Sequence, residues 1–131
     1  MSLATLLTDQ QQRLDALITL LSSEQNLLTQ GDIDGDALTK VALEKQTLLT
    51  ELERIESVRR NVQQRLGYAD GAKGAREAAA NAGCQTAWDS LLEKSERASR
   101  MNELTGQMLS VRMKHNQAML DYIRQIAEKT L

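Results

Sequence analysis

Leucine recurs at every seventh position near the start of the chain, at Leu7, Leu14, Leu21 and Leu28. Strict heptad spacing favours a helix that supercoils left-handed against a partner helix. The 131 residues contain no proline, so nothing of that kind interrupts a helix anywhere in the chain. The seam is imperfect, because Gln10 and Glu24 occupy seam positions between the leucines. A chain with these properties is predicted to fold into long, uninterrupted helices.

Apolar periodicity over the rest of the chain extends this prediction to a fold class. We predict one all-α domain, residues 1–131, built as an antiparallel bundle of three long helices with coiled-coil-like packing and a short helical segment rich in glycine and alanine. The expected helices span about residues 2–30, 36–66, 75–96 with a break near 83, and 98–130. A single helix over 85–130 would be about 69 Å long at 1.5 Å per residue, so a break near 95–100 or a projecting end is expected.

The acidic turn between the first two helices resembles a calcium loop only superficially. If Asp32 were the first ligand of an EF-hand, glycine should follow at the sixth position and glutamate at the twelfth. Those positions hold Ala37 and Leu43. The sequence instead predicts that Asp34 or Asp36 caps the second helix by accepting hydrogen bonds from its free amides. No metal site is predicted here.

Four polar or unusual residues lie within apolar stripes, and each has a structural interpretation. Lys45 and Arg59 are expected to lay their methylene groups on the core while their charges reach water, because an unpaired buried charge costs several kcal/mol. Trp88 is expected to fill the core, since Leu91 and Leu92 follow it at helical spacing. His115 is expected to be partly buried with a structural role.

The segment between Gly67 and Gly83 differs in composition from the helices around it. It holds four of the seven glycines together with many alanines. Small side chains bury little apolar area, so we expect this segment to be the most mobile part of the fold. Within it, residues 67–74 are predicted to form a loop and residues 75–82 a weak helix.

The last helix has a wider apolar arc than one packing contact requires. Projected at 100° per residue, residues 101–127 give an arc of about 220°, against about 160° for each earlier helix. Its main face, expected to be core, contains Leu104, Met108, Val111, Ala118, Met119, Tyr122 and Ile126. Its shoulder contains Leu109, Met113, Leu120 and Ala127. Four of the five methionines lie in this helix, and thioether side chains adapt to varied partners. The predicted partner-binding residues are Leu104, Met108, Leu109, Met113, Leu120, Tyr122 and Ile123.

Several classes of function are not supported by the composition. The net charge of -2, the absence of a lysine and arginine stripe and the presence of only three aromatic residues argue against nucleic-acid binding. No apolar run approaches the roughly 20 residues of a membrane span. The single cysteine, Cys84, cannot form an internal disulfide, and the first residues lack the pattern of a signal peptide, so a cytoplasmic location is expected. We predict no catalytic, cofactor-binding or metal-binding residues, and hence no enzyme.

Two groups of short segments resemble the FlgN-type flagellar export chaperones. The first group is Leu28–Leu38 (LTQGDIDGDAL) followed by Leu43–Leu52 (LEKQTLLTEL). The second is Trp88–Lys94 (WDSLLEK), then Asn102 with Gly106, then Asn116–Leu120 (NQAML). The resemblance implies a cytoplasmic chaperone that holds the hook-filament junction proteins FlgK and FlgL and delivers them to the type III export gate without consuming ATP itself. It also gives the C-terminal helix a client, because an amphipathic client helix needs an apolar surface to cover it.

A second interpretation stays open at this point. In a coiled-coil assembly or adaptor protein, the wide arc of the C-terminal helix would be buried in a homodimer. The sequence does not separate these alternatives, because both require the same apolar residues.

Overall fold

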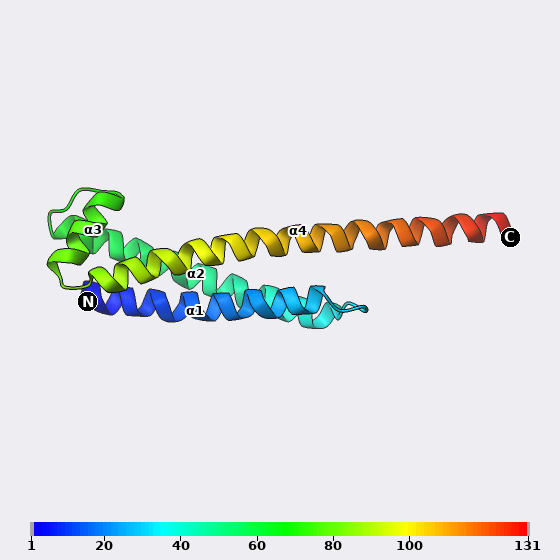
Figure 1. The fold of residues 1–131 in the computed structure, drawn as a ribbon, viewed down its shortest axis with the longest axis horizontal. Coiled ribbons are helices and arrows are strands. Elements are labelled where there is room, and N and C mark those ends of the chain that lie inside the picture. Colours follow the sequence, from blue (N-terminus) through cyan, green and yellow to red (C-terminus); the bar gives the residue numbers. More distant parts are fainter. Residues whose placement is uncertain (1, 131) are drawn as a thin grey trace.

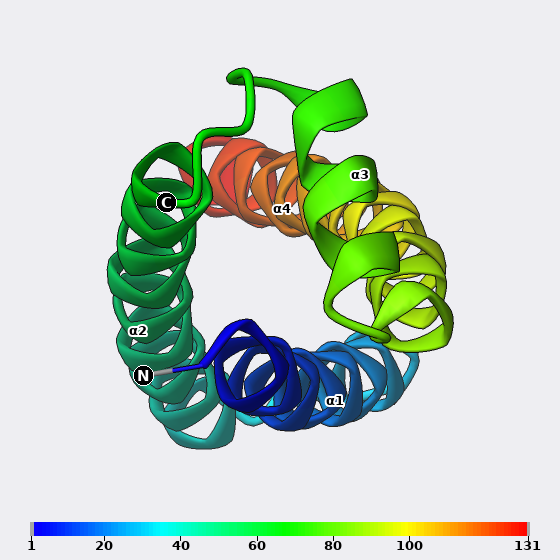
Figure 2. The same ribbon diagram turned by 90° about the vertical axis from the view of Figure 1, so that its left-hand side faces the viewer.

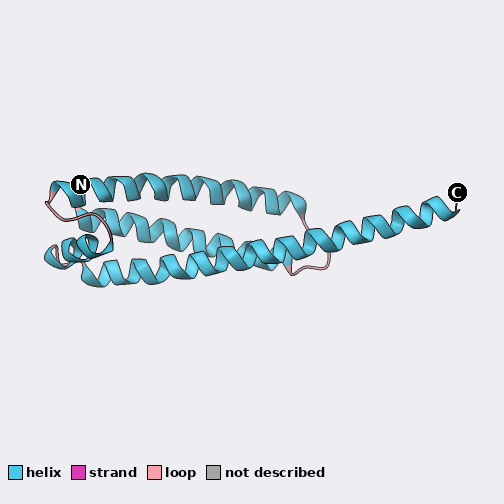
Figure 3. Cartoon of the chain, turned by 90° about the horizontal axis from the view of Figure 1, so that it is seen from above, coloured by secondary structure: helices cyan, strands magenta, loops and turns pink. Residues whose placement is uncertain are grey.

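The computed structural model describes residues 2–130, apart from the side chains of residues 118–120, 123, 126–127 and 129–130. It contains four helices: α1 (Leu3–Leu28), α2 (Gly35–Arg65), α3 (Ala72–Asn81) and α4 (Gln85–Thr130). No strand occurs over residues 2–130. The all-α helical bundle predicted from the sequence is therefore confirmed (Figures 1 and 3).

The three long helices run up, down and up (Figure 1). Between α1 and α2 the pairs are antiparallel, since Gln10 bonds to Glu56 and Glu24 to Lys45. Helices α1 and α4 are parallel, because positions increase together along both of them. Gln11 donates to the Ala87 carbonyl near the start of each helix, and Gln25 donates to Thr105 Oγ1 farther along both. Successive long helices are thus antiparallel, as predicted, and α4 runs in the same direction as α1.

Helix α1 packs against both other long helices, and its seam is buried. Leu7 and Leu21 have no exposed surface, and Leu14 and Leu28 are 5% and 3% exposed. The main core also takes residues from α3 and the first half of α4, including Ala75, Ala78, Ala79, Trp88, Leu91 and Ala98. Seen along the bundle in Figure 2, α2 and α4 lie on two sides of α1, and α3 covers one end.

The polar residues in the seam of α1, Gln10 and Glu24, are each paired with a residue of α2. Buried Glu24 accepts a hydrogen bond from Lys45 Nζ at 2.8 Å, and buried Gln10 donates to Glu56 at 2.7 Å. Arg59 is only 6% exposed. The expectation that its charge reaches water is wrong, because Glu56 neutralises it inside the bundle and Gln63 accepts from its Nη1. Lys45 is likewise held by a buried carboxylate rather than by water alone.

The connection between α2 and α4 is a short packed helix. Asp34 caps α2, as predicted, through its Oδ1 and the Ala37 amide, whereas α3 begins at Ala72, earlier than the predicted residue 75. Glycine is required at position 74, in the first turn of α3, because a Cβ there would lie 1.7 Å from the Ala69 carbonyl oxygen. Three of the five alanines of α3, Ala75, Ala78 and Ala79, are buried, and Cys84 is also buried. Small residues here allow close approach of α3 to the bundle.

Helix α4 is continuous over 46 residues. The break predicted between residues 96 and 98 is therefore wrong, and the projecting end is confirmed (Figure 1). The reason is visible in the residues facing α1, which keep three- and four-residue spacing across that region and are all buried or half-buried: Ala87, Leu91, Lys94, Ala98, Met101, Thr105, Met108 and Arg112. A helix whose packing seam is uninterrupted has no reason to turn.

Among the described residues, no helix carries an apolar stretch long enough to cross a lipid bilayer.

Candidate functional site: the projecting end of α4

The described contacts between α4 and the body of the bundle end close to Arg112. Gln25 Nε2 donates to Thr105 Oγ1 at 3.2 Å, and Arg112 Nη2 donates to the Gly31 carbonyl at 3.0 Å. Helix α1 ends at Leu28. Residues 113–130, which we call the projecting segment, continue α4 for about 27 Å at 1.5 Å per residue. Figure 1 shows this segment extending beyond the ends of α1 and α2.

Four of the predicted partner-binding residues present large apolar surfaces to solvent. Met113 is 63% exposed and Tyr122 62%, while Leu104 is 49% and Leu109 39% exposed. Met108 is half-buried. The side chains of Leu120 and Ile123 lie outside the described residues. The structure thus places the described members of the predicted set along one accessible helix.

Three described residues of the main face are not core, contrary to the prediction, while the side chains of Ala118, Met119 and Ile126 lie outside the described residues. Leu104, Val111 and Tyr122 were expected to pack inside the bundle, yet they are 49%, 65% and 62% exposed. Leu104 and Val111 lie off the face by which their neighbours Thr105 and Arg112 contact the body, whereas Tyr122 lies beyond Arg112, where α1 has already ended. His115 is exposed for the same reason, so its predicted partial burial is also wrong.

A shallow hollow marks the point where α4 leaves the bundle. It has a volume of about 380 Å³ and is lined by Leu28 of α1 together with Leu104, Gln107, Met108, Val111 and Arg112 of α4. Sequence reasoning missed Leu28 and Arg112 as members of this site. One feature of the sequence could have identified Leu28. It is the last leucine of the heptad series, so the apolar seam continues from it toward the N-terminus of α1 but not beyond it.

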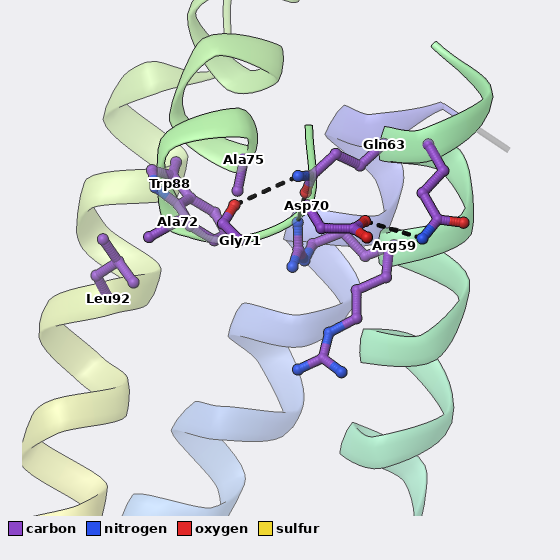
Figure 4. Close-up of a pocket in the computed structure, with 10 residues that line it drawn as sticks. Arg59, Gln63, Asp70, Gly71, Ala72, Ala75, Trp88 and Leu92 are labelled. Atoms are coloured by element: carbon purple, nitrogen blue, oxygen red, sulfur yellow. Dashed lines mark hydrogen bonds between the residues drawn. The ribbon is translucent and has the colours of Figure 1, made fainter. Parts of the chain in front are cut away.

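A second concave region, the Trp88 groove, lies between α2 and α4 at the other end of the bundle. It consists of two hollows of about 530 and 300 Å³ that share Trp88 and Leu92. Figure 4 shows Trp88 and Leu92 reaching it from α4, and Arg59 and Gln63 from α2. Leu92 is 39% exposed, so the groove has an accessible apolar wall.

Charge in the Trp88 groove is balanced internally. The Arg59 guanidinium lies 5.0 Å from the centre of the Trp88 ring, within the range of a cation–π contact. Burial opposes ionisation of Glu56, but hydrogen bonds from Arg59 and Gln10 and the nearby positive charges outweigh it, so the pKa of Glu56 is lowered below its ordinary value. Gln10 Oε1 is buried and has no hydrogen-bond partner among the described residues.

Over the described residues, no three histidine, cysteine, aspartate or glutamate side chains converge as they would around a metal ion. The apolar end of α4 and the Trp88 groove each offer aliphatic or aromatic surface along a helix axis, which is the kind of surface that amphipathic helices pack against.

Comparisons with known proteins agree with a protein-binding role. A Flagella synthesis protein FlgN from Salmonella typhimurium is 28% identical over 118 residues, which cover 90% of this chain and 76% of that protein. The protein of the same name from Escherichia coli K12 is 26% identical over 129 residues, covering 98% of this chain and 84% of its own length. No solved structure matches. The family model for FlgN protein matches residues 1–131.

This family consists of flagellar chaperones and not of enzymes. Since its model spans the whole chain, the chain belongs to the FlgN family.

Proposed function

We propose that this protein is a cytoplasmic chaperone of flagellar type III export, which binds the hook-filament junction proteins FlgK and FlgL before their secretion and delivers them to the export gate. The single observation that carries the proposal is the exposed apolar surface of α4 from Leu104 to Tyr122. Relatives that carry the name Flagella synthesis protein FlgN support the flagellar setting.

The physical basis is the pairing of two amphipathic helices. An apolar face on one helix can bind a client helix through anchors spaced three or four residues apart. Leu104, Met108 and Val111 have that spacing and line a hollow with Leu28. Met108 and Met113 can adapt to clients of different sequence, because their side chains are unbranched. Such a surface suits a chaperone that must hold more than one client and release each of them.

The test is a titration of the full chain with C-terminal fragments of FlgK and FlgL, followed by hydrogen exchange. We expect saturable binding, with amide protection confined to residues 104–130. The competing interpretation, a coiled-coil adaptor whose C-terminal helix is buried in a homodimer, predicts no binding of either fragment. Absence of binding at tens of micromolar would therefore overturn the chaperone proposal.

Two matched variants locate the binding surface. Val111 in α4 and Leu43 in α2 are exposed to nearly the same extent, 65% and 66%. Val111→Asp should weaken client binding strongly, because a charge would enter the apolar contact. Leu43→Asp adds the same charge elsewhere and should leave client affinity unchanged. Equal loss in both variants would show that the effect comes from charge and not from the surface.

A further inference from the structure

The bundle pairs its buried and half-buried cations with carboxylates, and Arg112 is the exception. Over the described part of the chain, the lysine and arginine side chains that are buried or half-buried are Arg13, Lys45, Arg59, Lys94 and Arg112. The first four form ion pairs with Glu51, Glu24, Glu56 and Asp15, in that order. No described carboxylate lies within 4 Å of the Arg112 guanidinium. Its charge is therefore partly withdrawn from water without the partner that every comparable cation has.

Only part of the hydrogen-bonding capacity of Arg112 is used inside the chain. Its Nη2 donates to the Gly31 carbonyl at 3.0 Å. Its Nε is buried and has no hydrogen-bond partner among the described residues. A guanidinium carries four N–H groups on its two Nη atoms, so the bond to Gly31 leaves three of them available to a ligand. That bond also holds the guanidinium in place, which lowers the entropy cost of binding.

The surroundings of Arg112 are apolar and open to a partner. It lines the hollow of about 380 Å³ together with Leu28, Leu104, Gln107, Met108 and Val111. A helix that packs its apolar side chains on Leu104 and Val111 removes water from this hollow, and attraction between charges strengthens as water leaves. A helix without an acidic group would instead cover the Arg112 charge and leave it unpaired, which costs binding free energy.

We propose that Arg112 selects the client by pairing with an aspartate or glutamate side chain that lies beside the apolar anchors of an amphipathic client helix. The inference rests on the proposed function, because it names the chemistry of the client that α4 binds. A carboxylate and a guanidinium are both planar and can form two parallel hydrogen bonds, a geometry that lysine does not reproduce. The pair discriminates against helices that place an apolar or basic side chain there.

The distribution of charge favours the same kind of client. Residues 104–130 contain four lysines and arginines and two acidic residues, whereas residues 1–103 contain 12 and 16. The client surface is thus the positive part of a chain that is otherwise negative, and it attracts an acidic helix. The acidic turn beside the hollow already has other surroundings, since Asp34 Oδ1 accepts from the Ala37 amide and Asp32 is exposed.

The position of Arg112 favours a side-chain carboxylate over the carboxylate at a chain end. Exposed apolar residues lie on both sides of it along α4, from Leu104 to Tyr122. These two residues are about 27 Å apart at 1.5 Å per residue. A client helix that follows this surface passes Arg112 within its length, and there it presents a side chain.

The first experiment compares Arg112→Met with Arg100→Met in titrations against C-terminal fragments of FlgK and FlgL. Methionine keeps an unbranched apolar stem and removes the charge. Arg112→Met should weaken binding of each fragment about tenfold, the loss expected for a hydrogen bond to a charged group. Arg100→Met removes the same charge from a side chain of α4 that is 70% exposed and should leave affinity unchanged. Equal weakening by both variants would reflect net charge and would overturn the proposal.

A double-mutant cycle then separates recognition from a purely structural role of Arg112. Each aspartate and glutamate of a fragment is replaced in turn by asparagine or glutamine. One replacement should weaken binding to the unmodified chain about tenfold and have no further effect on Arg112→Met, because the two groups act as a pair. If Arg112 only held the turn at Gly31, the losses would add at every position, and that result would overturn the proposal. Weaker binding after amidation of the fragment's C-terminus would also overturn it.

The same titrations distinguish failure of this inference from failure of the proposed function. A chain that binds both fragments equally well before and after Arg112→Met overturns the role of Arg112 and leaves the chaperone function standing. An unmodified chain that binds neither fragment overturns the chaperone function, and the selection of clients by Arg112 falls with it. Circular dichroism of Arg112→Met should show the helix content of the unmodified chain, so that weaker binding is not a consequence of unfolding.

Discussion

The two halves of α4 belong to one helix but meet different surroundings. From Ala87 to Arg112 the residues that face α1 are buried or half-buried, whereas Met113 and Tyr122 are more than 60% exposed. Apolar periodicity continues across both halves, so the helix's own pattern does not distinguish them. The difference comes from α1, which ends at Leu28. The length of a neighbouring helix decides here which apolar residues form core and which form a binding surface.

Removal of the projecting segment should have the largest effect on function and almost none on the fold. A chain that ends at Arg112 keeps every buried residue that the structure describes. We expect it to lose binding of FlgK and FlgL fragments while its thermal unfolding midpoint, followed by circular dichroism, stays close to that of the full chain. Cooperative unfolding of the truncated chain at a much lower temperature would show that the second half of α4 is also structural.

The same substitution at a buried and at an exposed leucine of the packed half of α4 should separate core from surface. Leu91 is 6% exposed and Leu104 is 49% exposed. Leu91→Ala should destabilise the bundle by roughly 2–5 kcal/mol, because it leaves a cavity against α1. Leu104→Ala should change stability by about 0.5 kcal/mol or less, since its side chain is already in contact with water. Urea unfolding of both variants measures the difference, and similar losses would contradict the assignment of Leu104 to the accessible surface of α4.

The body of the bundle, against which the packed half of α4 lies, should also carry an acid-sensitive element, Glu56 of α2. The pKa of Glu56 is lowered in the folded chain, so the native state holds fewer protons there than the unfolded state does. The stability from this carboxylate is present above its ordinary pKa and is lost as the pH falls through the lowered folded value. Glu56→Gln should therefore flatten the decrease in unfolding free energy on acidification, measured by urea unfolding.

Two comparisons check the assignment of that acid sensitivity. The chain truncated at Arg112 keeps Glu56 and its partners Arg59 and Gln10, so its pH profile should match that of the full chain. Glu53→Gln removes an exposed carboxylate one turn away in α2 and should leave the profile unchanged. An equal flattening in Glu53→Gln would show that the pH dependence reflects net charge and not the buried hydrogen bonds.

Much of the fold followed from periodicity, because heptad leucines and the absence of proline predict long helices without knowledge of tertiary contacts. The Asp34 cap followed from local chemistry in the same way. The pairing of Arg59 with Glu56 and Gln63 did not follow, since burial of a charge depends on partners brought together by the fold. The exposure of Leu104 and Val111 could not be predicted either. It depends on which part of the apolar arc the fold turns toward α1, and an apolar arc is the same whether protein or solvent covers it.

The smallest change in stability is expected at Tyr122, where the comparison between the two halves is most direct. Tyr122 is 62% exposed and lies well beyond the last described contact with the body. Tyr122→Ala should alter the free energy of unfolding by less than about 0.5 kcal/mol, as for other exposed positions. Aromatic residues often dominate protein interfaces, so the same variant should weaken binding of FlgK and FlgL fragments measurably by calorimetry. Trp88→Ala, in the packed half, should instead lower the free energy of unfolding, because it removes a core side chain that lies beside Leu91 and under Arg59. A loss of stability in Tyr122→Ala would mean that the projecting segment packs against its own chain, and the distinction between the two halves of α4 would then fail.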